Sequence, residues 1–190
     1  MATITTKTVS PFSWDLDRSS LKVGDEITET LKDGREVVFV VMDKGVVGLK
    51  DCLGEHYMNA AWTNKGGWLA SDMRRYLAEE VFPLLPDELQ KVIVPRRFGD
   101  EYVALWLFSE MEVFGEHEWT GKDPDRGEQL EYFKDPANRI KRDEDGEPTW
   151  WWERSPLASS SDSFCFVNSD GNASYNGADF SRGVCFGFFI

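Results

Sequence analysis

The first third of the chain alternates short apolar runs with turn signals. The longest run, residues 37–42, reads Val-Val-Phe-Val-Val-Met, which is typical of a buried strand. Asp33-Gly34 before this run is a strong signal for a hairpin turn, and Lys44-Gly45 after it leads into a second apolar run at residues 46–49. We therefore predict that residues 1–58 form a β-meander.

A shorter pattern precedes this meander. Phe12, Trp14 and Leu16 alternate with polar neighbours after Pro11, which predicts a short strand. Such a strand could close the domain's own sheet or serve as an arm for oligomerisation, and we favour the first interpretation.

The middle of the chain changes to helical spacing. Ser71 is a good N-cap, Asp72 suits the positive end of a helix, and Pro83 and Pro86 predict its end. A second helix is predicted from Pro86, because a proline costs little in the first turn. The first helix would bury one apolar stripe, made of Met73, Tyr76, Leu77, Val81 and Phe82.

The rest of the chain is predicted to combine short strands with long loops. Strands are expected at residues 92–94, 103–107 and 150–153, and Ser109 is expected to cap a short helix that reaches Phe114. Residues 116–142 are loop-rich, residues 143–147 form an acidic turn, and later turns are expected at Asp170-Gly171 and Asn176-Gly177. We predict a single α+β domain spanning 1–190, with helices and a loop-rich insert at 59–149 and a ligand-binding region at 150–190.

The tail, residues 157–190, has an unusual composition. It contains no Lys, Glu, Gln, Met or Trp. Turns and strands account for much of this, since Ser, Asn, Asp and Gly favour turns and aromatic residues favour strands. Randomisation of Asn codons at their two adenines would also exclude these five residue types, and this second explanation accounts for the absence of Lys and Glu better.

Several motifs of the tail resemble the variable region of diversity-generating retroelement target proteins, which have a C-type-lectin-like (formylglycine-generating-enzyme-like) fold. They also resemble an uncharacterised bacterial domain with a W-W-x-R-S-P pattern. Similar segments occur upstream at residues 68–74, 105–115 and 132–140, so the resemblance covers about residue 59 onward. The motifs are Trp151-Trp152-x-Arg154-Ser155-Pro156, Phe164-Cys165-x-Val167-Asn168-Ser169-Asp170-Gly171-Asn172-Ala173 and Gly183-Val184-x-Phe186-Gly187-Phe188.

The resemblance implies a mixed β-sheet with two flanking helices and long irregular loops, carrying a hypervariable C-terminal face. The implied scaffold residues are Trp151, Trp152, Arg154, Ser155, Pro156, Cys165, Val167, Asp170, Gly171, Gly183, Val184 and Gly187. Gly171 and Gly183 would suit turns with positive φ, and Arg154 could bind backbone carbonyls. The implied variable, ligand-binding positions are Leu157, Ala158, Ser159, Ser160, Ser161, Ser163, Phe166, Ser174, Tyr175, Asn176, Gly177, Asp179, Phe180 and Arg182.

Such a set of residues is suited to recognition, because Tyr and Phe give rigid contact area and Ser, Asn and Gly give adaptable hydrogen bonds. Tyr175, Phe166 and Phe180 are the expected hot spots, with Arg182 and Asp179 as polar partners. All three aromatic residues could instead belong to the core. The resemblance implies non-covalent binding of a macromolecule, most simply a protein, and leaves homo-oligomerisation open. The alternatives are a fixed structural or adhesive domain of a phage tail or bacterial surface assembly, and an oxidative enzyme of the formylglycine-generating type.

Net charge narrows the classes of partner. With 34 acidic and 21 basic residues the chain carries a formal charge of -13, which disfavours nucleic acid and anionic membranes as partners. The first residues contain no apolar segment of the signal-peptide type, and no run approaches the ~20 apolar residues that span a bilayer. We expect synthesis in the cytoplasm, and incorporation into a phage particle stays open.

Metal and catalytic chemistry have weak signals. Cys52, Cys165 and Cys185 show no C-x-x-C spacing, and we expect buried thiols, although a bridge between Cys165 and Cys185 is conceivable. The Glu-Pro-Asn and Trp-Asn-Asp tripeptides of calcium-dependent lectins are absent, since residues 147–149 read Glu-Pro-Thr. We find no G-x-S-x-G, P-loop, H-E-x-x-H or G-x-G-x-x-G motif, and therefore expect no cofactor and no catalytic centre.

Overall fold

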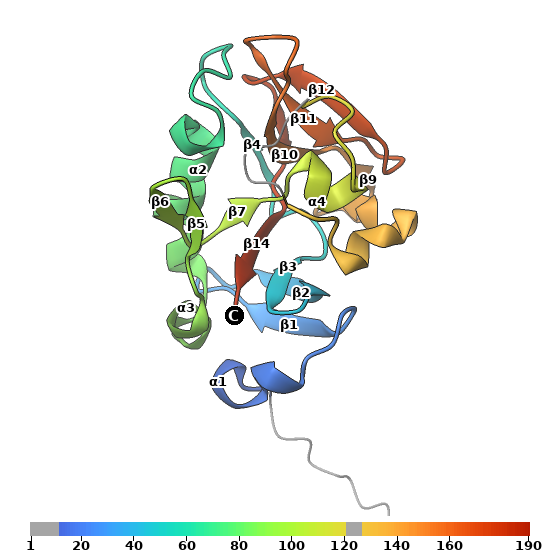
Figure 1. The fold of residues 1–190 in the computed structure, drawn as a ribbon. Helices are drawn as coiled ribbons and strands as arrows, with labels where there is room; N and C mark the ends of the chain where they lie inside the picture. The colour runs from blue at the N-terminus through green and yellow to red at the C-terminus, as the bar shows by residue number, and fades with distance from the viewer. Residues whose placement is uncertain (1–11, 121–126) are drawn as a thin grey trace, which may run out of the picture.

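The computed structural model describes residues 12–120 and 127–190, which form two five-stranded sheets and several short helices (Figure 1). The first sheet has the order β1 (Glu26–Thr30), β2 (Glu36–Asp43), β3 (Val46–Leu49), β14 (Phe186–Phe189), β7 (Trp106–Leu107). The second has the order β12 (Ala173–Gly177), β11 (Ser163–Val167), β10 (Trp151–Pro156), β13 (Ser181–Gly183), β4 (Glu55–Tyr57). Two small hairpins are added, β5 (Arg96–Phe98) with β6 (Glu101–Val103), and β8 (Lys141–Arg142) with β9 (Pro148–Thr149).

The helices are short and lie between strands. They are α1 (Trp14–Asp17), η1 (Arg18–Ser20), η2 (Trp68–Ala70), α2 (Asp72–Tyr76), η3 (Leu77–Val81), η4 (Phe82–Leu84), α3 (Asp87–Val92), α4 (Glu110–Phe114), η5 (Glu131–Lys134) and η6 (Pro136–Arg139). The mixed α+β class predicted from the sequence is confirmed. Among the described residues, no helix is both long enough and apolar enough to cross a membrane.

The β-meander predicted at the start of the chain is confirmed for β1, β2 and β3, which pair antiparallel in sequence order. The strand predicted around Trp14 is wrong, because residues 14–17 form α1. The Trp14 ring is buried and meets Phe39 and Phe188 edge-to-face, so its alternation with polar neighbours reflects one buried anchor in a helical turn. Pro11 and the side chain of Leu16 lie outside the described residues.

The helical predictions are largely confirmed. The Ser71 hydroxyl accepts a hydrogen bond from the Arg74 amide at 3.1 Å, and Ser109 forms a capping box with Glu112. The helical run from Asp72 passes through Pro83, which lies in the first turn of η4 where its missing N–H is not needed, and the run ends before Pro86.

Three strand and turn predictions are corrected. Residue Val92 ends α3, so no strand forms at 92–94, and Val94 makes only an isolated bridge to Phe189. The predicted strand at 103–107 is divided into β6 and β7. Asn176 and Gly177 lie inside β12, and the turn follows at residues 178–180. At β7 and at Asn176-Gly177, local propensity was outweighed by strand pairing, with β14 and with β11 respectively.

Large rings fill the core between the sheets. Phe39 meets both Phe186 and Phe188, which carries the meander onto the last strand of the chain. Gly48 and Gly187 lie opposite each other in neighbouring strands, and a Cβ at either would come within 2.6 or 2.8 Å of the Phe108 ring. These glycines allow Phe108 to pack flat on the sheet. One continuous apolar cluster extends through both sheets.

The second sheet presents the tail at the end of the molecule opposite α1 (Figure 1). Its central strand β10 is fully buried through residues 151–155. Strand β14 then leaves this end and pairs between β3 and β7, so the chain ends beside its own N-terminal meander. The tail is therefore fixed on both sides, by β10 and by β14.

Candidate functional site

Buried polar contacts hold the W-W-x-R-S-P strand in place. The Trp151 indole N–H donates to the Arg139 carbonyl at 2.9 Å, and the Trp152 indole N–H donates to the His56 carbonyl at 3.0 Å. The predicted contact of Arg154 with a carbonyl is confirmed, since its Nη1 donates to the Leu107 carbonyl at 3.0 Å. The strand therefore acts as a rigid frame for the segments that follow it.

Arg154 has a second and stronger partner that the sequence did not indicate. Its guanidinium pairs with both carboxylate oxygens of Glu112, and Arg96 pairs with the same carboxylate from the other side. Burial alone would raise the pKa of Glu112, but these two guanidinium groups outweigh it and lower the pKa below its usual value. A charged triad thus joins α4, β5 and β10.

The two scaffold glycines act differently. Gly171 lies in the β11–β12 turn beside the exposed Asp170. Its φ is +79°, so the predicted positive φ is confirmed. Gly183 does not have positive φ. A Cβ there would lie 2.5 Å from the Cys52 sulfur and 3.0 Å from the Trp150 carbonyl, so Gly183 is required by close approach between strands.

The fourteen positions implied by the resemblance divide into accessible and buried ones. The accessible or partly accessible side chains are Ala158, Ser159, Ser160, Ser161, Ser174, Tyr175, Asn176, Asp179, Phe180 and Arg182. The buried positions are Leu157, Ser163, Phe166 and Gly177. These four cannot contact a ligand in this conformation, which corrects their assignment as ligand-binding residues.

Each buried position has a local reason for its burial. Phe166 is 3% exposed because its ring stacks on Trp150 and meets Trp152 edge-to-face, so it belongs to the core. Leu157 is 4% exposed and its amide donates to the Ser163 carbonyl. A Cβ at Gly177 would come within 2.8 Å of the Trp62 indole nitrogen.

The accessible positions do not share one face of the sheet. Successive residues of a strand point to opposite faces, so Tyr175 points away from its neighbours Ser174 and Asn176. Ser174 lies opposite Phe166 in β11, on the face where Phe166 meets Trp150. The tail therefore offers two separate surfaces.

The first surface, which we call the Tyr175 face, is formed by Tyr175, Trp119 and Trp62. The rings of Tyr175 and Trp119 lie 5.0 Å apart, and Tyr175 is 47% exposed. Trp62 is 67% exposed and lies against Gly177, two residues along the same face of β12. Neither tryptophan is among the predicted ligand-binding residues. Each lies in a segment without apolar periodicity, and this was the one signal in the sequence that could have indicated an exposed ring.

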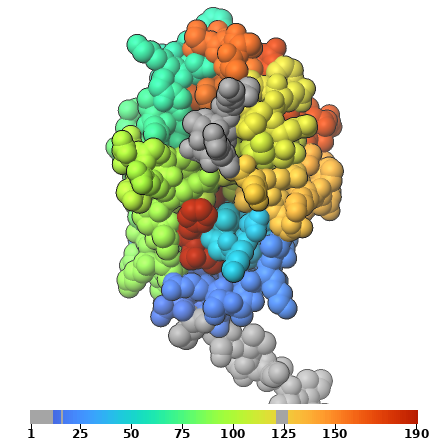
Figure 2. All heavy atoms as spheres, in the orientation of Figure 1, coloured from blue at the N-terminus to red at the C-terminus, as the bar shows by residue number. Residues whose placement is uncertain are grey.

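A hollow of about 540 Å³ adjoins this face, lined by Asn64, Lys65, Gly66, Thr120 and residues 156–161. The Asn64 amide nitrogen donates to the carbonyls of Ser160 at 2.8 Å and Ser163 at 2.9 Å, which fixes the loop that carries the serines. Figure 2 shows the segment around residue 60 beside the segment around residue 160 at this end of the molecule. The hollow offers hydroxyl and amide groups at its rim.

The second surface, which we call the Arg182 face, is an aromatic and cationic stack. The Arg182 guanidinium lies 4.8 Å from the Trp150 ring centre and 5.4 Å from that of Phe180. Phe180 is 49% exposed and Trp150 is 41% exposed. Burial lowers the pKa of Arg182. Trp, Phe and Arg in one stack can bind planar or anionic groups.

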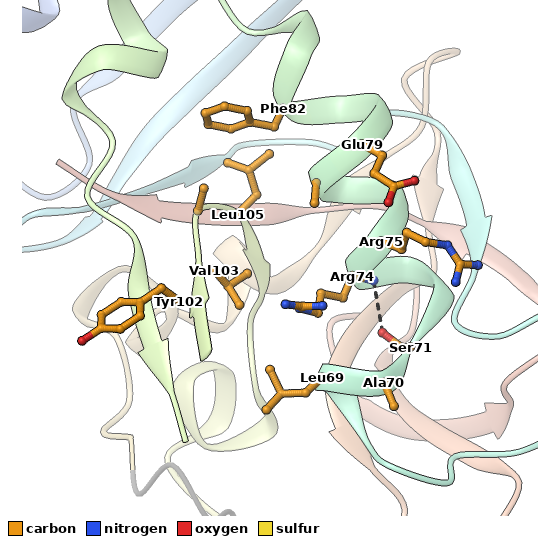
Figure 3. A pocket seen from close by; sticks show the side chains of 12 residues that line it. Leu69, Ala70, Ser71, Arg74, Arg75, Glu79, Phe82, Tyr102, Val103 and Leu105 are labelled. Carbon is orange, nitrogen blue, oxygen red and sulfur yellow. Dashed lines mark hydrogen bonds between the residues drawn. The ribbon is translucent and has the colours of Figure 1, made fainter. Parts of the chain in front are cut away.

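A second hollow, of about 420 Å³, lies away from the tail between α2 and β6 (Figure 3). Leu69, Val103 and Leu105 give it an apolar floor, and the Arg74 side chain points into it. The Arg74 guanidinium is already paired with Glu101. An anionic ligand would have to displace this carboxylate.

Buried ionisable groups lie beneath the Tyr175 face. The Glu110 carboxylate accepts hydrogen bonds from the amides of Glu118, Trp119 and Thr120 and from the Thr120 hydroxyl, which holds the Trp119 loop. The neighbouring Glu153 is fully buried, and neither of its carboxylate oxygens has a hydrogen-bond partner among the described residues. Burial, with the Glu110 carboxylate nearby, raises the pKa of Glu153 well above its usual value.

The cysteines are free thiols, so the conceivable bridge between Cys165 and Cys185 does not form in this structure. Burial raises the pKa of all three thiols. Because the thiolate is the reactive form, these side chains are poor nucleophiles at neutral pH in the folded chain. In the ranges 12–120 and 127–190, no three His, Cys, Asp or Glu side chains are placed to hold a metal ion.

Comparison with known proteins identifies the family without assigning an activity. Neither the curated proteins nor the solved structures contain a significant match. A family profile described as "Domain of unknown function (DUF6273)" matches residues 36–186, which include the whole second sheet and the tail surfaces but not β1 of the first sheet. The chain therefore belongs to the DUF6273 family.

Proposed function

We propose that this chain is a non-covalent binding protein of C-type-lectin-like architecture, which recognises a macromolecule, most simply a protein, through its C-terminal tail. The observation that carries the proposal is the exposure of large aromatic side chains at that end. Four side chains there are each at least 41% exposed, whereas most of the other Trp and Phe rings are buried in the core. The four are Tyr175, Phe180, Trp62 and Trp150. Clustered exposed aromatic residues are typical of interaction sites.

The chemistry of the exposed set supports recognition. Tyr175 and Trp62 supply rigid contact area, while the serines of residues 158–161 and Asn64 supply adaptable hydrogen bonds, as in antibody loops. Both surfaces rest on buried strands of the second sheet, so binding need not order them first. The position of the site at one end of the molecule leaves the other end free for attachment to a larger assembly.

The resemblance to retroelement target proteins leads us to propose further that the accessible tail positions are diversified. Diversification would be confined to the ten accessible positions. Replacement of Phe166 by Ser or Asp would leave a large cavity or a buried charge, and large-to-small changes at buried Phe cost about 3–5 kcal/mol. Leu157 is also buried, so its replacement by a small or charged residue would destabilise the fold for the same reason.

A fixed structural or adhesive domain of a phage tail or bacterial surface assembly is the second candidate, and the full or partial burial of most tail side chains favours it. The exposed tail positions are few, so burial and turn chemistry explain part of the missing Lys and Glu. These positions are Ala158, Ser159, Ser161, Asp170, Asn172, Tyr175, Asp179, Phe180 and Ser181.

Sequencing of this gene and its flanking DNA in a natural population separates the candidates. Substitutions confined to codons of the accessible tail positions, at adenines of a nearby near-repeat, would establish diversified binding. An invariant tail without such a repeat would refute diversification and leave the fixed binding domain.

The binding role is tested with the triple variant Tyr175→Ala, Asn176→Ala and Phe180→Ala. If these side chains serve recognition, the thermal midpoint stays within a few degrees of the parent, since none of them is buried. A loss comparable to that of Phe166→Ala would instead assign them to the fold. Phe166→Ala is the matched control, because it removes a buried ring from the neighbouring strand.

A further inference from the structure

Strand β12 is the outer strand of the second sheet, with β11 on one side and, among residues 12–120 and 127–190, no strand on the other. The pairing with β11 determines which main-chain N–H and C=O groups of β12 point away from the sheet. The Asn168 amide donates to the Asn172 carbonyl at the start of the hairpin, and the Ala178 amide donates to the Asp162 carbonyl at its far end. Antiparallel pairs alternate between hydrogen-bonded and non-hydrogen-bonded.

The hydrogen-bonded pairs between these ends are therefore Phe166 with Ser174 and Phe164 with Asn176. The N–H and C=O groups of Ala173 and Tyr175 point outward instead. In the hydrogen bonds of the described ranges, neither residue uses these groups. The edge ends at Gly177, whose amide donates to the Asn176 side chain and whose carbonyl accepts from the Phe180 amide.

An open edge of this kind is a template for another strand, and native sheets usually protect it. Here the edge lies beside Tyr175 and Trp119. We propose that β12 binds an extended, arginine-rich segment of a partner protein as an added antiparallel strand. This inference rests on the proposed binding function and names the mode and the partner chemistry of the same site.

Charge selects a basic partner. Residues 157–181 contain Asp162, Asp170 and Asp179 but no Lys or Arg, and the whole chain has a formal charge of -13. Asp170 lies in the turn before β12 and Asp179 in the turn after it, so acidic groups are present at both ends of the edge. A second copy of this chain, paired antiparallel, would bring like charges together, which disfavours that occupant.

The side-chain pattern selects arginine at alternate positions. In an added antiparallel strand, the residue opposite Tyr175 points to the same face as Tyr175, toward Trp119. A guanidinium there would lie over aromatic rings. The residue opposite Ser174 points to the other face and would be small and polar.

Main-chain pairing also fits a diversified strand. The hydrogen bonds from Ala173 and Tyr175 would be present whatever side chains these positions carried, so docking would tolerate change at Tyr175. The side chains would then set specificity, as in other cases of strand addition.

The test is a titration of the full chain with the capped heptapeptide Thr-Arg-Thr-Arg-Thr-Arg-Thr, followed by amide NMR and by fluorescence. We expect saturable binding with the largest amide shifts at Ala173 and Tyr175. Methylation of the Arg amides, which would face β12, should weaken binding roughly tenfold or more through loss of the strand hydrogen bonds. Methylation of the Thr amides, which would face solvent, is the matched control and should have little effect.

The variant Ala173→Pro removes the outward N–H without removing a hydrogen bond to β11, and Ala173→Val keeps that N–H. Weaker peptide binding by Ala173→Pro alone supports strand addition. The inference is overturned if the Arg peptide does not bind, if a Glu-for-Arg peptide binds equally, or if Arg-amide methylation has no effect. It is also overturned if the shifts fall on Phe180 and the serines of residues 158–161 but not on β12, an outcome that leaves the proposed function intact. Sequencing of the natural population tests diversification separately.

Discussion

Replacement of Glu153 by Leu should stabilise this protein at neutral pH. Glu153 lies in the centre of β10 and is fully buried, and in the part of the chain that the structure describes neither carboxylate oxygen has a hydrogen-bond partner. Its pKa is raised well above the usual value, first by burial and then by the Glu110 carboxylate, while Arg154 opposes the shift and Glu112 adds to it. Leu has a similar volume and leaves no buried polar atom without a partner.

The sign and size of the effect follow from proton linkage. An unfolded Glu has a pKa of about 4.3. Because the folded chain holds its proton on Glu153 to higher pH, it binds more protons than the unfolded chain above about pH 4.3. The free energy of unfolding therefore falls as pH rises through this window, by up to about 1.4 kcal/mol per pH unit. The contribution of Glu153 is therefore a progressive loss of stability as the pH rises above about 4.3.

The assay is urea unfolding followed by tryptophan fluorescence at several pH values between 5 and 8. The difference in unfolding free energy between Glu153→Leu and the parent should grow with pH, because only the parent carries the titrating group. Glu153→Gln is the matched control. It should remove the same pH dependence but remain less stable than Glu153→Leu, since a buried amide without partners costs about 1–3 kcal/mol.

Two outcomes would refute this reasoning. If the parent and both variants share one pH slope, Glu153 does not titrate in the predicted window. If Glu153→Leu is less stable than the parent at pH 7, the carboxylate has a stabilising partner in solution, and the argument from its burial fails.

Three further predictions concern packing, the loop and the thiols. Gly187→Ala places a Cβ 2.8 Å from the Phe108 ring and should destabilise the fold by about 1–3 kcal/mol in urea unfolding, whereas an unchanged midpoint would show that the ring moves freely. Asn64→Ala should cost about 1–3 kcal/mol, because buried carbonyls of the serine loop lose their donor, and Asn64→Asp should cost more by placing an acceptor there. Cys165 and Cys185 should resist a maleimide reagent at pH 7 until urea unfolds the chain, and fast labelling of the native chain would contradict their burial.

The sequence by itself determined the features that depend on neighbouring residues. The hairpin signal at Asp33-Gly34, the apolar run at 37–42 and the caps at Ser71 and Ser109 each act through local backbone chemistry, and each is present in the structure. The same local rules failed at Trp14, because one buried ring in a helical turn gives the same short alternation as a strand. They failed again at Asn176-Gly177, where pairing with β11 outweighed turn propensity.

Tertiary structure alone decided which tail residues are accessible. Phe166 and Phe180 have the same side chain and both fit the same codon restriction, yet Phe166 is buried against Trp150 and Phe180 is half exposed. The difference arises because β11 is flanked by strands on both sides, whereas Phe180 lies in a turn beyond the edge strand.

Contacts between distant segments also assembled the surfaces. Trp62 and Trp119 meet the β12 strand from loops about 55–115 residues earlier in the chain, and no local pattern could place them there. Glu153 shows the same limit, since its neighbours in sequence do not reveal that both carboxylate oxygens lack partners within residues 12–120 and 127–190. Local chemistry sets the strands and caps, and long-range packing decides what each strand exposes.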